Sequence, residues 1–308
     1  MSELNEPLGA DVPQGLIRLR GRISYDGTDF SGWGMQPDRR TVQGDLESAF
    51  ASILRTPRLV IQCAGRTDAG VHAIGQVFHI DVPIDKYIGH ERMTYRLNSL
   101  LDEDVVVQSL ENAPAGFDAR FSALSRTYEY LINDGQRQPL MRRFVLLHGY
   151  PIDLEHAKAS SQQLLGLHDF SAFCKPKPYG TTIRELQVFD WARREDGLIA
   201  IKVKADAFCY SMVRGLVGAV LDVAADKKPA SWLTEYLEGG KRETGVFVAP
   251  ACGLTFISVE YPPDNELESR MAITKRTRSN DGSTGFSSED SLGDSSADSL
   301  DGTADGSY

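Results

Sequence analysis

The residues whose types and spacing could do chemistry lie in the stretch A-G-R-T-D-A-G-V-H-A, residues 64–73. It places one carboxylate, Asp68, between Arg66 and the small residues Ala69 and Gly70. Small neighbours let a planar ligand approach the backbone, and a guanidinium binds phosphate. Because a carboxylate is ionised at neutral pH in water, Asp68 suits a nucleophile or base. The alternative is a hairpin connection in which glycines relieve strain and Asp68 caps a turn.

The elements that must position this loop are predicted from hydrophobic periodicity, and the strands and helices come in the same order in both parts of the chain. The first part predicts strands at Leu16–Ser24, Arg58–Ala64, Ile74–Val82 and Val105–Leu110 and helices at Thr41–Arg55 and Tyr87–Leu101. The second predicts strands at Arg126–Asn133, Glu185–Arg193, Leu198–Ala205 and Leu254–Glu260 and helices at Leu154–Leu165 and Phe208–Ala225. This order predicts an α+β fold of two ferredoxin-like (RNA-recognition-like) halves, with antiparallel sheets merging around a central cleft on their open face.

The charge is concentrated at the two ends of the 308-residue chain, whose net charge is −10. Residues 279–308 hold seven acidic residues and residues 1–14 hold three, with no basic residue in either, so the body between them is neutral. The overall acidity therefore excludes no polyanionic partner. We predict a disordered tail at 1–14, halves at 15–116 and 117–262, and a disordered acidic Ser/Gly/Asp-rich tail at 263–308. The acidic tail either solvates the protein or competes with a polyanionic substrate.

No cofactor or metal site is predicted. The four cysteines, Cys63, Cys174, Cys209 and Cys252, form no C-x-x-C pair, so neither a zinc site nor a disulfide framework is expected, and burial is favoured. His72 and His79 lack an H-E-x-x-H pattern and are interpreted as packed or surface residues. No apolar run reaches the length of a membrane span and the N-terminus lacks a signal-peptide pattern, so we expect a cytoplasmic protein without membrane contact.

Four arginines allow more than one interpretation. Arg18, Arg20 and Arg22 recur at period two, so they project to one side of the first strand, either as a solvated face or as RNA contacts. Arg214 lies in a strongly apolar predicted helix, where an unpaired guanidinium is unfavourable. It either extends to solvent or pairs with an acidic residue.

The run at residues 64–73 resembles the signature of the tRNA pseudouridine synthase A family. Further similar motifs are Y-D-G-T-D-F-S-G-W (25–33), T-V-Q (41–43), R-L-N-S-L-L (96–101), F-D-A-R-F-S-A (117–123), R-T-Y-E-Y (126–130), H-D-F-S-A-F (168–173) and M-V-R-G-L-V-G (212–218). The similarity covers about residues 16–262. Two positions depart from the family pattern: Gly34 and Met35 intervene before Gln36, and Ser211 stands where many members have His.

The resemblance implies an isomerase that converts uridine to pseudouridine at positions 38, 39 and 40 in the anticodon stem-loop of tRNA. It implies that Asp68 is the catalytic residue of the central active-site cleft and that Tyr128 stacks on the substrate. It also implies that Arg214 pairs with Asp68 and that Arg66 helps to flip the base or contacts the backbone. Family members need no cofactor or metal and work as homodimers on the anticodon arm.

Two other functions remain alternatives. A non-catalytic tRNA-binding module on the same fold would bind RNA without forming pseudouridine. A hydrolase of small glycosides would require a second carboxylate near Asp68, and the loop offers none.

Overall fold

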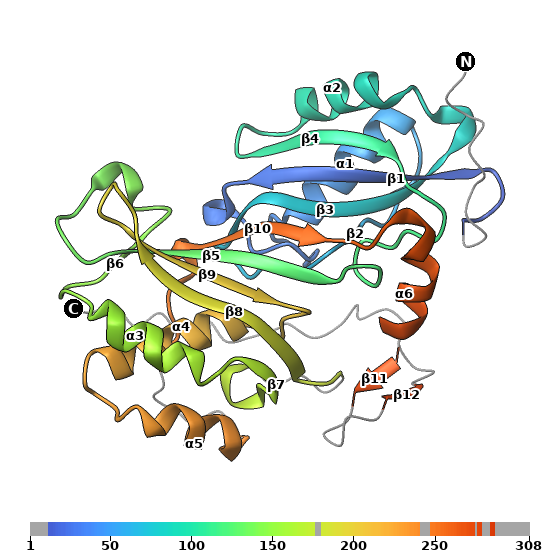
Figure 1. Ribbon diagram of the computed structural model, residues 1–308. Coiled ribbons are helices and arrows are strands. Elements are labelled where there is room, and N and C mark those ends of the chain that lie inside the picture. Colours follow the sequence, from blue (N-terminus) through green and yellow to red (C-terminus); the bar gives the residue numbers. More distant parts are fainter. Residues whose placement is uncertain (1–11, 176–179, 241–246, 275, 279–283, 287–308) are drawn as a thin grey trace.

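A computed structural model describes residues 12–175, 180–240, 247–274, 276–278 and 284–286 (Figure 1). The strands are β1 Leu16–Tyr25, β2 Gln62–Cys63, β3 His72–Pro83, β4 Val105–Asn112, β5 Ser125–Asn133, β6 Leu146–Leu147, β7 Gly166–Asp169, β8 Ile183–Arg193, β9 Ile199–Ala205, β10 Leu254–Glu260, β11 Arg276–Arg278 and β12 Thr284–Phe286. The helices are α1 Val42–Leu54, α2 His90–Leu100, α3 Leu154–Gln162, α4 Met212–Ala224, α5 Ser231–Gly239 and α6 Leu267–Thr274.

One large sheet joins the two parts of the chain in the order β4-β1-β3-β10-β5-β9-β8-β7, with β2 paired to β3 and β6 to β5. Neighbours along this order are antiparallel except β3 and β10, which are parallel. β10, which comes last of these strands in the chain, therefore connects the first part to the second. In Figure 1, α1 and α2 accompany the first part and α3, α4 and α5 the second. The predicted α+β class with merged antiparallel sheets is confirmed.

The buried face of the sheet is set by alternation along β1. Leu19 and Ile23 are fully buried, and Gly21 between them leaves room for the ring of Phe78 on β3. Phe50 of α1 packs against that ring at a centroid distance of 6.3 Å. α1 therefore covers the face of the sheet to which the alternate residues of β1 point.

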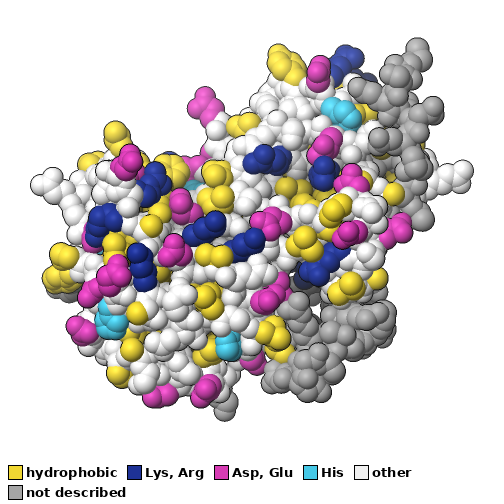
Figure 2. Space-filling model, viewed as in Figure 1, with side chains coloured by type: hydrophobic (Ala, Val, Ile, Leu, Met, Phe, Trp, Pro, Cys, Tyr) yellow, Lys and Arg dark blue, Asp and Glu magenta, His cyan; other side chains and the backbone are white. Residues whose placement is uncertain are grey.

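The opposite face carries mixed charges, which Figure 2 shows as blue and magenta side chains interleaved over the sheet. Arg18 lies opposite Asp81 and Arg20 opposite Glu111, and each pair is joined by an ion pair of 2.7 Å. Arg22 is exposed. Since opposite charges on neighbouring strands stabilise a sheet, Arg18 and Arg20 have a structural role there. The interpretation as RNA contacts stays a prediction.

Several predicted elements are shorter in the structure, and two of them differ most. Of the strand predicted at 58–64, only β2 pairs with β3, because the amide of Ile61 donates to the side chain of Glu47 at 2.8 Å instead of to a strand. The helix predicted to start at Phe208 begins at Met212, after a residue with left-handed backbone conformation. β6, β7, α5 and α6 were not predicted.

α6 lies within the segment predicted as an acidic tail, 263–308. Leu267 at its first position is fully buried, so apolar burial orders this part of the chain. Residues 279–283 and 287–308 lie outside the described residues, as do residues 1–11. The division into halves at 116/117 stays a prediction.

Within the described ranges, no helix has the length and apolar character needed to cross a membrane. The same ranges contain no group of three or more His, Cys, Asp or Glu side chains arranged to hold a metal ion.

Candidate active site

The loop that carries Asp68 runs from β2 to β3 and is held along its backbone by other elements. The carbonyl oxygen of Gly65 accepts a hydrogen bond from the side-chain amide of Gln76 at 2.7 Å. The carbonyl oxygen of Thr67 accepts one from the amide of Trp33 at 3.0 Å. Gly32 has φ +93°, and a Cβ there would lie 2.8 Å from the Thr67 oxygen. The loop is therefore a fixed support for its side chains.

The carboxylate of Asp68 is bound by residues that are distant in sequence. The hydroxyl of Ser211 donates to Asp68 Oδ2 at 2.9 Å, and Nη1 of Arg214 donates to the same oxygen at 3.2 Å. No hydrogen bond to Oδ1 is present from any part of the chain that the structure describes. The Asp68 side chain is 13% exposed, so small sequence neighbours do not leave it open. A turn-capping role is not supported, because its two donors come from α4 and the residue before it.

Arg214 reaches Asp68 from α4, whose other contacts hold the helix close to neighbouring backbone. Its Nε donates to the carbonyl oxygen of Ala249 at 2.7 Å, and the amide of Ala249 donates back to the Arg214 carbonyl at 3.1 Å. A Cβ at Gly218 would lie 2.0 Å from the carbonyl oxygen of Phe247, so only glycine permits this approach. The pair of Arg214 with Asp68 that the family resemblance implied is present in the structure.

Tyr128 lies on β5 beneath the Asp68 loop. Its ring contacts the rings of Phe208 and Phe256 edge-on, each at a centroid distance of 5.1 Å, and the residue is 6% exposed. A Cβ at Gly65 would lie 3.8 Å from its hydroxyl oxygen. Burial raises the pKa of Tyr128, and the nearby Tyr25 and Asp68 raise it further. The hydroxyl is therefore a hydrogen-bond donor at neutral pH, although its role toward a substrate stays a prediction.

Arg66 is exposed at the start of the same loop. Its side-chain stem lies beside Gly34, where a Cβ would be 3.8 Å from Arg66 Cδ. Among the residues that the structure places, none forms an ion pair with its guanidinium. A guanidinium without an acidic partner is available to a phosphate or a base.

The Asp68 loop lies on the helix-bearing face of the sheet, whereas the active-site cleft was expected on the open face. Tyr25 ends the buried alternation of β1, and its hydroxyl is 2.9 Å from the hydroxyl of Thr67, next to Asp68. The loop thus folds over the face that α1 covers. Alternation along a strand defines two faces, but it does not show toward which of them a following loop turns.

Arg126 is a supporting residue that sequence reasoning missed. It is 7% exposed, and its guanidinium donates to the carbonyl oxygens of Ala64, Arg120 and Asp206 at 2.6–3.1 Å. These carbonyls belong to the loop before Asp68, the segment before β5 and the segment after β9. Burial lowers the pKa of Arg126. Its place in R-T-Y-E-Y, two residues before Tyr128, was the available signal.

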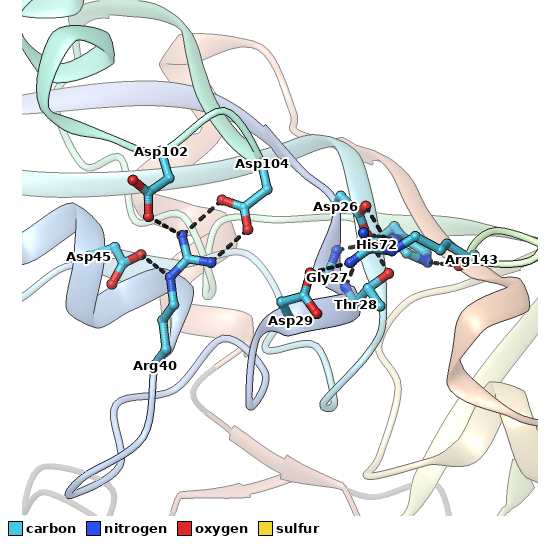
Figure 3. A network of polar contacts seen from close by, with 10 residues as sticks. All are labelled: Asp26, Gly27, Thr28, Asp29, Arg40, Asp45, His72, Asp102, Asp104 and Arg143. Atoms are coloured by element: carbon cyan, nitrogen blue, oxygen red, sulfur yellow. Dashed lines mark hydrogen bonds and ion pairs between the residues drawn. The ribbon is translucent and has the colours of Figure 1, made fainter. Parts of the chain in front are cut away.

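His72 is buried and packed, the first of the two roles expected for it. Its Nδ1 accepts from the amide of Gly27 at 3.0 Å, and its Nε2 donates to the carbonyl oxygen of Arg143 at 2.9 Å (Figure 3). The side chain of Arg143 also contacts Asp26 and Asp29. These contacts attach the segment after β5 to the turn after β1.

A second polar cluster fixes the segment between that turn and α1. Arg40 forms ion pairs with Asp45 of α1 and with Asp102 and Asp104 before β4 (Figure 3). Its guanidinium also lies 4.2 Å from the ring centroid of Phe30. The cluster anchors the segment that contains Gly34 and Trp33, which contact Arg66 and Thr67.

The prediction that no disulfide is present is wrong for one pair of cysteines. Cys174 and Cys209 are bonded although they are 35 residues apart, while Cys63 and Cys252 are free. The amide of Lys175 donates to the carbonyl oxygen of Tyr210 at 2.9 Å, so the two segments run side by side. Sequence spacing does not show such proximity.

Comparisons of the sequence with known proteins give one family. The family model described as tRNA pseudouridine synthase matches residues 23–122 and 161–262. A tRNA pseudouridine synthase A of Frankia casuarinae is 48% identical over 87% of this chain and 97% of its own length. The protein of the same name from Mycobacterium leprae is 46% identical over 85% of this chain and 96% of its own length. That from Streptomyces avermitilis is 44% identical over 87% and 96%.

The family match includes both segments that meet at Asp68. The first matched range contains the Asp68 loop, and the second contains Ser211 and Arg214. The relatives are matched over nearly their whole length, so the similarity is not confined to one motif. The chain belongs to the tRNA pseudouridine synthase A family.

Proposed function

We propose that this protein isomerises uridine to pseudouridine in tRNA, with Asp68 as the catalytic residue. The observation that carries this proposal is the carboxylate of Asp68, which is held through Oδ2 by Ser211 and Arg214 while Oδ1 has no partner among the described residues. Membership of the tRNA pseudouridine synthase A family supports the same reaction. The protein is thus an isomerase that acts on tRNA.

The reaction balances without an added reactant. The N1–C1′ glycosidic bond breaks, uracil turns within the site, and a C5–C1′ bond forms while the C5 proton is lost and N1 is protonated. A carboxylate can begin this sequence by attack on C1′, by addition to C6 or by removal of a ribose proton. In each case Asp68 acts as a carboxylate, and the guanidinium of Arg214, 3.2 Å from Oδ2, holds it in place.

The substrate nucleotide must leave its stack to reach Asp68, which costs a few kcal/mol. Arg66 is exposed beside Asp68 without an acidic partner in the described structure, so it is placed to contact the RNA backbone or the space that the base leaves. Tyr128 presents a phenol under the same loop. We assign it to the flipped base, through contact with its ring or a hydrogen bond from its hydroxyl.

The anticodon arm, with uridines 38, 39 and 40, is the substrate region that we propose, together with a homodimeric assembly and a cytoplasmic location. Family resemblance supports the region and the dimer. Sedimentation of the protein alone and with tRNA measures the assembly directly.

The test is a map of pseudouridine in unmodified tRNA transcripts after incubation without cofactors. Wild-type protein is expected to convert uridines of the anticodon arm, and Asp68→Asn to be slower by at least about 1000-fold because the carboxylate chemistry is lost. Asp81→Asn is the matched control, since Asp81 also pairs with an arginine but on the other face of the sheet. It is expected to keep wild-type turnover.

The outcomes separate the proposal from its alternatives. RNA binding by both wild type and Asp68→Asn without conversion of any uridine would instead establish a binding module. Turnover of a free nucleoside in preference to tRNA would support a small-glycoside hydrolase.

A further inference from the structure

Ser211 stands directly before α4, in the N-cap position. Its carbonyl oxygen accepts a hydrogen bond from the amide of Gly215 at 2.9 Å, as expected there. A serine in this position usually caps the helix by accepting a second bond with its side chain from an amide of the first turn. The Ser211 side chain makes no such capping bond and instead donates to Asp68 Oδ2 at 2.9 Å. The side chain therefore binds Asp68 and does not cap the helix.

The backbone of Ser211 has φ 62° and ψ 11°, in the left-handed region. This conformation is unfavourable for residues other than glycine, asparagine and aspartate, and it persists where the surrounding structure enforces it. The residues before it are held by the bond from Lys175 to Tyr210 and by the amide of Met212, which donates to the Cys209 carbonyl at 3.1 Å. An unfavourable conformation is therefore maintained where the chain meets the carboxylate.

The two donors from this helix start converge on one oxygen of Asp68. Ser211 and Arg214 are three residues apart, so they lie on the same side of the first turn. Because both bind Oδ2, the carboxylate cannot turn without breaking both bonds, and Oδ1 stays directed away from them. Arg214 alone, at 3.2 Å through one nitrogen, would hold either oxygen equally well.

We infer that Ser211 is a positioning residue that fixes the rotation of the Asp68 carboxylate and leaves Oδ1 as the oxygen that faces the nucleotide. This inference rests on the function proposed above. Ser211 acts through Asp68 and needs no contact with the substrate.

Two substitutions separate the hydroxyl from the backbone. Ser211→Gly removes the donor and suits the left-handed conformation, whereas Ser211→Asn also suits it and keeps an N–H donor. Asp226→Gly is the matched control, because Asp226 has φ 55° beyond the other end of α4. All three proteins are compared by pseudouridine formation on tRNA transcripts and by thermal melting.

The Gly variant is expected to lose about 10- to 100-fold in kcat, the range for a hydrogen bond to a charged group, while KM for tRNA stays within about twofold. Its melting temperature is expected to equal or exceed that of wild type, since glycine removes the backbone strain. Ser211→Asn is expected to recover part of the lost kcat, and Asp226→Gly to keep wild-type kcat. A purely structural role would lower the melting temperature and leave kcat of the folded enzyme unchanged.

The inference is overturned if Ser211→Gly keeps kcat within about twofold of wild type, or if its loss of kcat is not relieved in Ser211→Asn. Wild type and Asp68→Asn are measured in the same assay. A wild-type protein that forms no pseudouridine contradicts the proposed function itself. A wild-type protein that forms it, beside an equally fast Gly variant, contradicts only the role of Ser211.

Discussion

The hydroxyl of Tyr128 has no hydrogen-bond partner in the described parts of the chain, although only 6% of the residue's surface is exposed. Burial raises its pKa, so the group remains a donor across the physiological range. A hydroxyl that no protein group accepts from is available to donate to a ligand. Its position beside Gly65, beneath the Asp68 loop, makes the flipped base the acceptor that we expect.

Tyr128→Phe is therefore expected to lower kcat/KM for tRNA by about tenfold without reducing the free energy of unfolding, because no protein hydrogen bond is lost. Tyr130→Phe is the matched control on the same strand. Its hydroxyl donates to the Pro250 carbonyl at 2.8 Å, so that variant should lose about 1 kcal/mol of stability and keep its activity. Urea unfolding and pseudouridine kinetics on both variants check the pair, and a stability loss in Tyr128→Phe would contradict the assignment.

For single residues, the sequence indicated the candidate site residues but not the side chains that hold them in place. Asp68, Arg66, Tyr128 and Arg214 stand in motifs, and the structure brings the first and last of these together. The bond from Ser211, which joins residues 143 positions apart, was not predicted, and the similarly distant pair of Arg214 with Asp68 was implied only by the family resemblance. A side-chain contact across such a distance depends on the final packing and leaves no local pattern.

Arg126 shows how one side chain holds several elements at the site. It lies on β5, and its guanidinium binds carbonyl groups of three separate segments, including Ala64 just before the Asp68 loop. Buried carbonyl groups need such donors. No other side chain type offers donors in the required fork.

Arg126→Met keeps much of the volume and removes every donor. We expect the free energy of unfolding to fall by about 3–5 kcal/mol, since several buried carbonyls lose their partner. Arg20→Met on β1 is the control: its partner Glu111 is 53% exposed, so the expected loss is below about 1 kcal/mol. Urea titrations measure the free energy of unfolding of both variants. Equal losses would show that the Arg126 hydrogen bonds contribute no more to stability than the exposed ion pair of Arg20.

Element types were predictable where one periodicity extends over many residues, as in β1, α1 and β9. The predicted element boundaries are wrong where side-chain hydrogen bonds replace regular backbone pairing. The strand predicted from Arg58 is interrupted because Glu47 captures the Ile61 amide. α5 was missed although Trp232, Leu233, Tyr236 and Leu237 have helical spacing, a pattern that was present in the sequence.

At the scale of the whole molecule, one site is assembled from both parts of the chain. Asp68 precedes β3, whereas Ser211 and Arg214 belong to the start of α4, and β10 joins the two parts by pairing with β3 and β5. The repeated element order predicted two merged sheets. The open face expected for the site is not the face that carries it, because both faces of a sheet are compatible with the same strand order.

The disulfide between Cys174 and Cys209 links the segment that ends at residue 175 to the segment before α4. Cys209 lies between Phe208, which packs on Tyr128, and Ser211, which binds Asp68. Replacing both cysteines by serine is expected to lower the free energy of unfolding by about 2–4 kcal/mol. It should also lower kcat, since the segment before α4 is then less constrained. Cys252→Ser, at a free cysteine, is the control for stability. Titration of the denatured, unreduced wild type should find two free thiols, and finding four would show that the bond does not form.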